Sequence, residues 1–178
     1  MSVDYYLAID PGMATGVAIG RVTEDRPMEV VYRAIIQGGT YGFSEWLYNT
    51  RNGKSWVEED CSKNFPDQYA SLEWHLDVVC ETFRVMATQF APNVEALRIE
   101  GVVMSTFPRV IHWNKPADKI LIGDKFLKDN GLWVTGKDVG HTDGRDANDA
   151  MLHLFAHALK LRHQPTIKQF WRNNDKSN

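Results

Sequence analysis

Apolar and polar positions near the start of the chain fall into three blocks. Residues 5–10, 15–21 and 28–36 are rich in apolar and β-branched side chains, and Pro11-Gly12 and residues 24–27 separate them. Short apolar blocks bounded by turn residues are typical of strands, and such short connections favour hairpins. We therefore expect three sequential antiparallel strands.

After residue 36, the spacing of the apolar residues changes. Apolar residues at helical intervals, closed by Pro92, predict a helix over residues 67–90, after a long loop over residues 37–66. Residues 96–99 are expected to form a fourth strand. The remaining pattern predicts a helix that begins near Pro116 and ends at Asn130-Gly131, a fifth strand at 132–135, and a last helix at 145–163.

The predicted order of three strands, helix, strand, helix, strand, helix is typical of an α/β fold with a mixed five-stranded sheet flanked by helices. With 178 residues, 43% of them hydrophobic, the chain can bury the core of one domain. We place this domain at residues 1–163, with the loop at 37–66 as an insertion and residues 164–178 as a polar C-terminal tail.

Composition limits the classes of protein to which the chain could belong. The net charge of −3 gives no basic surplus of the kind that nucleic-acid binders usually carry, although a cluster of metal-binding acids would itself lower the formal charge. Cys61 and Cys80 are too few and too far apart for a thiolate metal site. No segment approaches the ~18 apolar residues of a membrane span, so we expect a cytoplasmic protein without a membrane partner.

Two acids stand at the ends of predicted strands. Asp10 follows the apolar run 5–9, and Glu100 follows the predicted strand 96–99. If these strands pair in parallel across the intervening helix, the two carboxylates are neighbours. Taken singly, either acid is explained as a solvated strand end.

Two further acids open the last predicted helix. Asp146 and Asp149 are three residues apart and share one helical face, while an apolar face on the same helix suits close packing on a sheet. Taken alone, they would merely complement the helix dipole. With Asp10 and Glu100, they predict a site for Mg²⁺, for which Mn²⁺ could substitute, because hard oxygen ligands select these ions. Two such ions would suit phosphodiester hydrolysis.

Three short motifs that contain these acids resemble those of a known family. The carrying motifs are Ile9-Asp10-Pro11-Gly12 with Thr15-Gly16, Ile99-Glu100-Gly101-Val102, and Asp146-Ala147-Asn148-Asp149-Ala150. They resemble the RuvC-like Holliday-junction resolvases of the ribonuclease H-like superfamily. The resemblance implies a ribonuclease H-like fold, a catalytic tetrad of these four acids, and a homodimer whose subunits each nick one strand of branched DNA.

The chain departs from that family pattern in three respects. The connection at residues 136–144 is short, the insertion at 37–66 is long, and the overall charge is acidic. A compact bacteriophage type would be consistent with all three. By resemblance, Lys137 would contact the scissile phosphate, although a solvated turn lysine is the plainer interpretation. His153 would be either a proton shuttle or outer partner of the acids, or a packed histidine.

A segment rich in aromatic and basic residues follows Glu100. Phe107 and Trp113 could stack on bases while Arg109 and Lys115 contact phosphates, so we expect these four residues to bind nucleic acid. A dimer contact or a hydrophobic plug is the alternative.

Other functions remain open. Within the same fold, a ribonuclease H or a general structure-selective nuclease would use the same acids. From different classes, Asp10-Pro11-Gly12 also fits the phosphate loop of an actin-like ATP-binding fragment, and a catalytically silent nucleic-acid-binding module could keep the fold.

Overall fold

A mixed five-stranded sheet forms the centre of the molecule. The computed structural model describes residues 3–51, 76–83, 94–107 and 111–171. The strands are β1 (Val3–Asp10), β2 (Ala14–Thr23), β3 (Arg26–Gln37), β4 (Leu76–Glu81) and β5 (Ile111–Asn114), in the order β3-β2-β1-β4-β5. The first three strands pair antiparallel, whereas β1, β4 and β5 run parallel. The predicted mixed five-stranded sheet is therefore confirmed, although residues other than the predicted ones form two of its strands.

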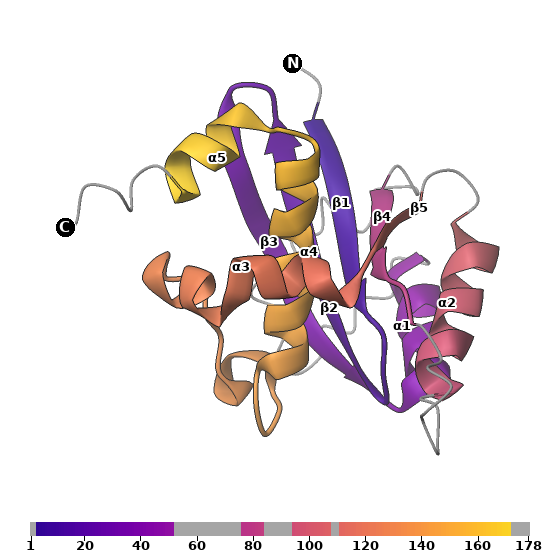
Figure 1. Ribbon diagram of the computed structural model, residues 1–178. Coiled ribbons are helices and arrows are strands. Elements are labelled where there is room, and N and C mark those ends of the chain that lie inside the picture. Colours follow the sequence, from indigo (N-terminus) through magenta and orange to yellow (C-terminus); the bar gives the residue numbers. More distant parts are fainter. Residues whose placement is uncertain (1–2, 52–75, 84–93, 108–110, 172–178) are drawn as a thin grey trace.

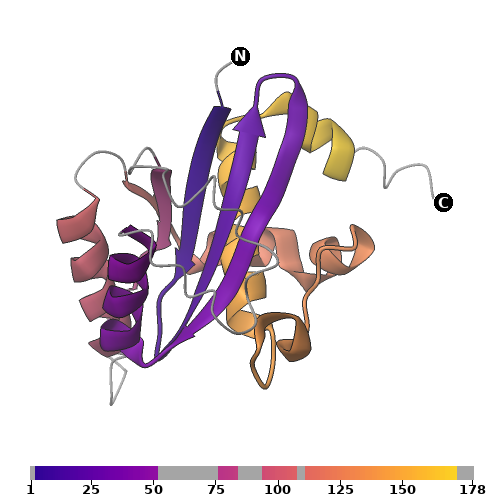
Figure 2. The same cartoon turned by 180° about the vertical axis from the view of Figure 1, so that it is seen from behind.

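Helices cover both faces of this sheet. They are α1 (Gly39–Arg51), α2 (Val94–Thr106), α3 (Pro116–Asp129), α4 (Arg145–Lys160) and α5 (Gln164–Phe170). Helices α1 and α2 lie on one face, and α4, crossed by α3, lies on the other (Figures 1 and 2). No helix within the described ranges is long and apolar enough to cross a membrane.

The alternation of side chains along the strands divides the core in two. On β1, Tyr6 and Ala8 pack with the helix α4 side, while Leu7 and Ile9 pack with α1 and α2. Because both faces of the central strands are covered, they are apolar throughout rather than alternating. This two-sided burial fixes the position of the strand ends that carry the candidate site.

One prediction fails at β4. Residues 76–81 form a central parallel strand and not part of a helix, and the flanking parts of the predicted helix lie largely outside the described residues. Val78, Val79 and Cys80 are all fully buried. A run that is buried on both faces has no period of two, so its pattern does not separate a strand from a buried helix.

The strand predicted at residues 96–99 is also wrong. These residues belong to α2, whose buried positions Ala96, Ile99 and Val103 recur at helical intervals. The predicted fifth strand at 132–135 is likewise absent from the sheet. There, the side-chain amide of Asn148 binds the backbone N–H and C=O of Val134 at 3.0 and 2.9 Å, while β5 holds the edge position beside β4.

The predicted loop and tail both contain helices. Residues 39–51 form α1, which buries Phe43, Trp46 and Leu47 at helical spacing, while residues 52–66 lie outside the described part. Helix α5 begins the predicted tail and ends at Phe170. The ring of Trp171 stacks on Phe126 at a centroid distance of 4.5 Å, which attaches the start of the tail to the domain.

Candidate active site

Asp10 and Glu81 meet at the carboxyl edge of the sheet. Ile9 and Cys80 are partners in the parallel ladder between β1 and β4, so Asp10 and Glu81, the last residues of these two strands, lie side by side. Neighbouring strands lie about 4.8 Å apart. Both side chains are 14% exposed. The strand register therefore brings two largely buried carboxylates into one site.

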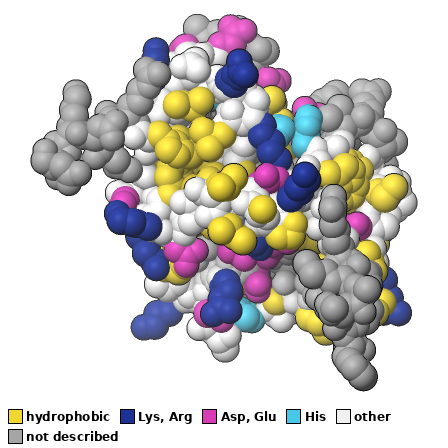
Figure 3. Space-filling view, in the orientation of Figure 1, with side chains coloured by type: hydrophobic (Ala, Val, Ile, Leu, Met, Phe, Trp, Pro, Cys, Tyr) yellow, Lys and Arg dark blue, Asp and Glu magenta, His cyan; other side chains and the backbone are white. Residues whose placement is uncertain are grey.

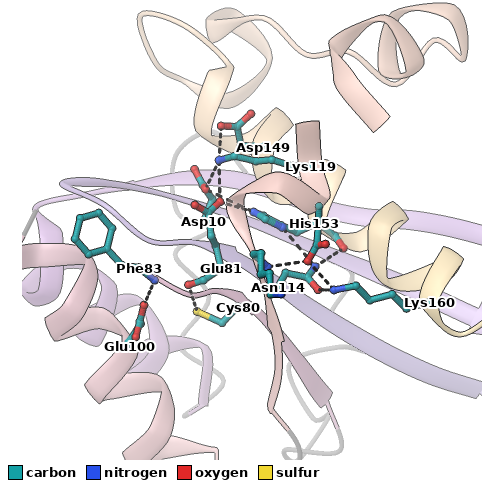
Figure 4. A network of polar contacts seen from close by, with 12 residues as sticks. Asp10, Cys80, Glu81, Phe83, Glu100, Asn114, Lys119, Asp149, His153 and Lys160 are labelled. Carbon is teal, nitrogen blue, oxygen red and sulfur yellow. Dashed lines mark hydrogen bonds and ion pairs between the residues drawn. The ribbon is translucent and has the colours of Figure 1, made fainter. Parts of the chain in front are cut away.

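Helix α4 adds Asp149 to this pair. The start of α4 lies directly against β2, where a Cβ on Gly16 would come within 1.9 Å of the carbonyl oxygen of Asp146. Only glycine allows this approach. Asp149 lies one turn before His153, and both residues point toward the sheet edge that carries Asp10 (Figure 4). Close packing of α4 thus completes a cluster of three carboxylates.

The ammonium of Lys119, on α3, lies among these three acids. Its Nζ is 2.9 Å from Asp10 Oδ1, 2.9 Å from Glu81 Oε2 and 2.8 Å from Asp149 Oδ2. The lysine side chain is 17% exposed. Figure 4 shows the Lys119 ammonium between the carboxylate of Asp149 and those of Asp10 and Glu81. One cation is therefore shared by three carboxylates from three different elements.

A second set of contacts holds Glu81 from behind. His153 Nε2 lies 2.6 Å from Glu81 Oε2, and the imidazole is fully buried. The amide of Asn114, at the end of β5, contacts the other ring nitrogen at 3.4 Å. Lys160 Nζ donates to Asn114 Oδ1 at 2.6 Å and to Asp118 Oδ2 at 2.7 Å. This polar network links α4, β5 and the first turn of α3 behind the acids.

The electrostatics of the acids differ. Burial, partly offset by Lys119 and reinforced by Asp149 and Glu81, raises the pKa of Asp10 to about 8. Burial opposes ionisation of Glu81 too, but hydrogen bonds from His153 and Lys119 outweigh it and hold the Glu81 pKa at about 2. The three carboxylates raise the pKa of Lys119 against the effect of its burial. Negative charge at this site thus depends on a nearby cation.

The donor set suits a divalent metal ion. Ligand atoms of Asp10, Glu81 and His153 all lie within 4.8 Å of one another. Asp149 adds a further carboxylate oxygen on the same cation, Lys119. Hard oxygen donors from three carboxylates match Mg²⁺ or Mn²⁺. The position of the ammonium marks where the acids already bind a positive charge.

The other members of the predicted tetrad lie differently. Glu100 is on α2, where its Oε1 accepts a hydrogen bond from the backbone N–H of Phe83. It therefore does not end a strand beside Asp10, and Glu81 occupies that position. Asp146 lies in the first turn of α4, and burial and the neighbouring Asp143 and Asp149 raise its pKa. Lys137 is exposed in a short 3₁₀ helix at Gly136–Val139.

One of the four predicted nucleic-acid contacts is buried in the core. Phe107 is only 5% exposed and packs in the core with Ile99 and Val103, so its ring has no free face for a base. Arg109 lies outside the described residues. Trp113 is 37% exposed on β5, and Lys115 is exposed at the start of α3. On the face of the molecule drawn in Figure 3, Lys and Arg side chains are scattered among acidic and apolar ones.

Sequence reasoning missed Glu81, Lys119 and Asn114. Glu81 had a usable signal, because it ends the apolar run Val78-Val79-Cys80 in the same way that Asp10 ends its own strand. Lys119 and Asn114 had none, since each is defined by tertiary contacts of separate elements.

Comparisons with known proteins agree with this fold. No family model matches the sequence, and no curated protein matches it. Among solved structures, T. thermophilus RuvC in complex with a Holliday junction substrate is similar, with a TM-score of 0.53 and 11% identity over 91% of this chain and 97% of that chain. At this identity the likeness shows the fold alone. The predicted ribonuclease H-like α/β class is confirmed.

Proposed function

We propose that the protein is a metal-dependent endonuclease that nicks branched DNA and resolves four-way junctions. The observation that carries the proposal is the convergence of Asp10, Glu81 and Asp149 on one cation at the carboxyl edge of the sheet. The fold is shared with RuvC, which was solved on a Holliday junction. We assign the second acid to Glu81 in place of Glu100 because only Glu81 ends a strand parallel to β1.

The metal in this proposal is Mg²⁺, with Mn²⁺ as a substitute. Asp10, Glu81 and Asp149 would hold it, and Asp146 would orient a ligand or water from the first turn of α4. When bound, the ion would activate a water molecule and stabilise charge on the departing 3′ oxygen. Hydrolysis of the phosphodiester would leave a 5′ phosphate and a 3′ hydroxyl.

The chain's own residues supply the rest. Asp10 and Glu81 are positioned by a buried ladder, so their carboxylates need little reorganisation. Lys119 places a positive charge among the three acids, which favours their ionised form until a divalent cation takes its place. Because the cluster is largely buried, water screens its charges poorly, and the interactions between them are stronger than in solvent.

The substrate class rests on different grounds from the chemistry. Branched DNA is proposed from the neighbour's complex, and a homodimer is proposed because paired nicks in one junction need two sites. Trp113, Lys115 and Arg109 would contact DNA beside the site, and Lys137 would approach it from the 3₁₀ helix. A cytoplasmic location completes the proposal.

A cleavage assay on three labelled substrates tests it. A mobile four-way junction, a plain duplex and an RNA–DNA hybrid are each incubated with Mg²⁺, with Mn²⁺ and with chelator. Paired nicks in the junction alone, dependent on metal, are expected. Cleavage of the hybrid or of every branched form would assign a ribonuclease H or a general structure-selective nuclease. Binding of junction without any cleavage would assign a silent binding module.

A further inference from the structure

His153 makes the closest side-chain contact to Glu81 in the site. Its Nε2 lies 2.6 Å from Glu81 Oε2 and 3.9 Å from Asp10 Oδ1, and its side chain is 0% exposed. The other ring nitrogen, Nδ1, lies 3.4 Å from Asn114 Nδ2. Both ring nitrogens therefore face a polar group of the protein.

The orientation of the Asn114 amide fixes which partner donates. Lys160 is a donor only, and its Nζ lies 2.6 Å from Asn114 Oδ1, so the amide oxygen points to Lys160. Asn114 Nδ2 in turn donates to the backbone carbonyl of His153 at 3.2 Å. A flipped amide would place two donors together and two acceptors together. Asn114 consequently presents N–H groups to the imidazole.

We propose that His153 is a positioning residue for Glu81, held as the neutral tautomer with its proton on Nε2. Nδ1 accepts from Asn114, so the remaining ring proton sits on Nε2 and is donated to Glu81 Oε2. This hydrogen bond fixes the carboxylate from behind while its other lone pairs stay free for a cation. The inference rests on the proposed role of Glu81 as a metal ligand.

The competing assignment makes His153 itself a ligand, since its Nε2 falls in the same group of closely spaced donor atoms as Asp10 and Glu81. Coordination requires an unprotonated nitrogen. Because Nδ1 faces Asn114, only Nε2 could coordinate. The ring would then lose its Nε2 proton and, with it, the hydrogen bond to Glu81. The short distance to Glu81 Oε2 and the longer one to Asp10 Oδ1 favour a donated hydrogen bond.

Nitrogen-15 NMR of the histidine side chains reads the tautomer directly in the wild-type protein. His153→Gln identifies the His153 signals by their loss. We expect His153 to show an unprotonated Nδ1 and a protonated Nε2, and to keep the Nε2 proton when Mg²⁺ is added to saturation. Loss of that proton on adding Mg²⁺, or a proton on Nδ1 in the free protein, would overturn the proposal.

Variants separate positioning from ligation. His153→Gln can still place an N–H near Glu81, whereas His153→Leu cannot, so Mn²⁺ affinity measured by calorimetry should fall about 10- to 100-fold in the Leu variant only. Equal loss in both variants, or no loss in the Leu variant, would contradict the account. Asn114→Asp keeps the size of Asn114 but replaces its N–H donor with an acceptor, and should place a proton on Nδ1.

These readouts separate the two proposals. The tautomer and the Mn²⁺ affinities are measured without a nucleic-acid substrate, so a failure of junction cleavage leaves them standing. Conversely, a nuclease whose His153 coordinates the metal would keep the proposed function and lose this inference. Thermal unfolding of each variant confirms that it is folded before its affinity is compared.

Discussion

Asp10 and Glu81 end neighbouring parallel strands, one position beyond the register pair of Ile9 and Cys80, and share the ammonium of Lys119 at 2.9 Å each. The sheet itself thus sets the spacing of these two acids. Since β1 and β4 are buried on both faces, the carboxylates are held by a closely packed part of the fold. The predictions below follow from this arrangement.

The assignment of the second acid is tested by a matched pair of substitutions. Glu81→Gln should lower the rate of junction cleavage by about 10³-fold, the equivalent of several kcal/mol of lost charge stabilisation. Glu100→Gln removes an acid of the same type on α2 and should leave the rate within a few-fold of wild type. Single-turnover cleavage measures both rates. A larger loss in the Glu100 variant would restore the tetrad expected from the sequence.

Lys119 should compete with divalent cations for the three carboxylates. Lys119→Met leaves those acids uncompensated, so the free energy of unfolding without metal should fall by about 3–5 kcal/mol at neutral pH. Added Mg²⁺ should then raise the melting temperature more in this variant than in wild type. Lys125→Met, on the exposed part of the same helix, is the control and should respond as wild type does. An equal Mg²⁺ response in all three proteins would argue against competition.

Gly16 sets how closely α4 approaches the sheet. Gly16→Ala would place a Cβ against the backbone carbonyl of Asp146, so the variant should lose about 1–3 kcal/mol of stability or more, together with cleavage activity. Gly101→Ala, on α2, meets nothing within 4 Å and should be neutral or stabilising by about 1 kcal/mol. Denaturant unfolding of both variants checks this. Equal stability of the two would show that α4 tolerates displacement.

Acid stability should depend on His157. Burial, with His112 and Lys160 adding, lowers the pKa of this buried imidazole from 6.5 to about 4. The unfolded chain therefore binds a proton that the native state does not, and stability falls as pH drops from about 6.5 to 4, by up to about 3 kcal/mol.

His157→Leu removes the imidazole that binds this proton. The variant should therefore flatten the profile of unfolding free energy against pH between about pH 6.5 and 4. At pH 8, where the imidazole is neutral in both states, the same variant shows the packing effect alone. A profile as steep as that of wild type would mean that other groups dominate the acid limb.

The sequence predicted the fold because its outer elements carry local signals. The three hairpin strands, the helix beginning at Pro116 and the final helix each have clear turns or helical spacing. The middle of the chain was misassigned because β4 is buried on both faces, and such a run has no distinguishing period. Residues 96–99 look apolar enough for a strand, but they pack as one face of α2.

The sequence named some residues of the candidate site for the same reason. Asp10 and Asp149 lie at well-marked element ends, and the structure brings both onto Lys119. Glu100 entered the predicted tetrad because of the misplaced strand, and Glu81 was missed for the same reason. Lys119 could not be found from sequence, because its role depends on how α3 crosses α4, which local spacing does not encode.

Cleavage of a labelled four-way junction by wild type and by Asp10→Asn, with Mg²⁺ and with chelator, tests the central claim most directly. The substitution removes an anionic ligand without changing its size. We predict paired nicks for wild type with Mg²⁺ and none in chelator, with Asp10→Asn inactive but still binding the junction in a gel-shift assay. Nicking that persists in Asp10→Asn or in chelator would contradict a metal-dependent nuclease built on these acids.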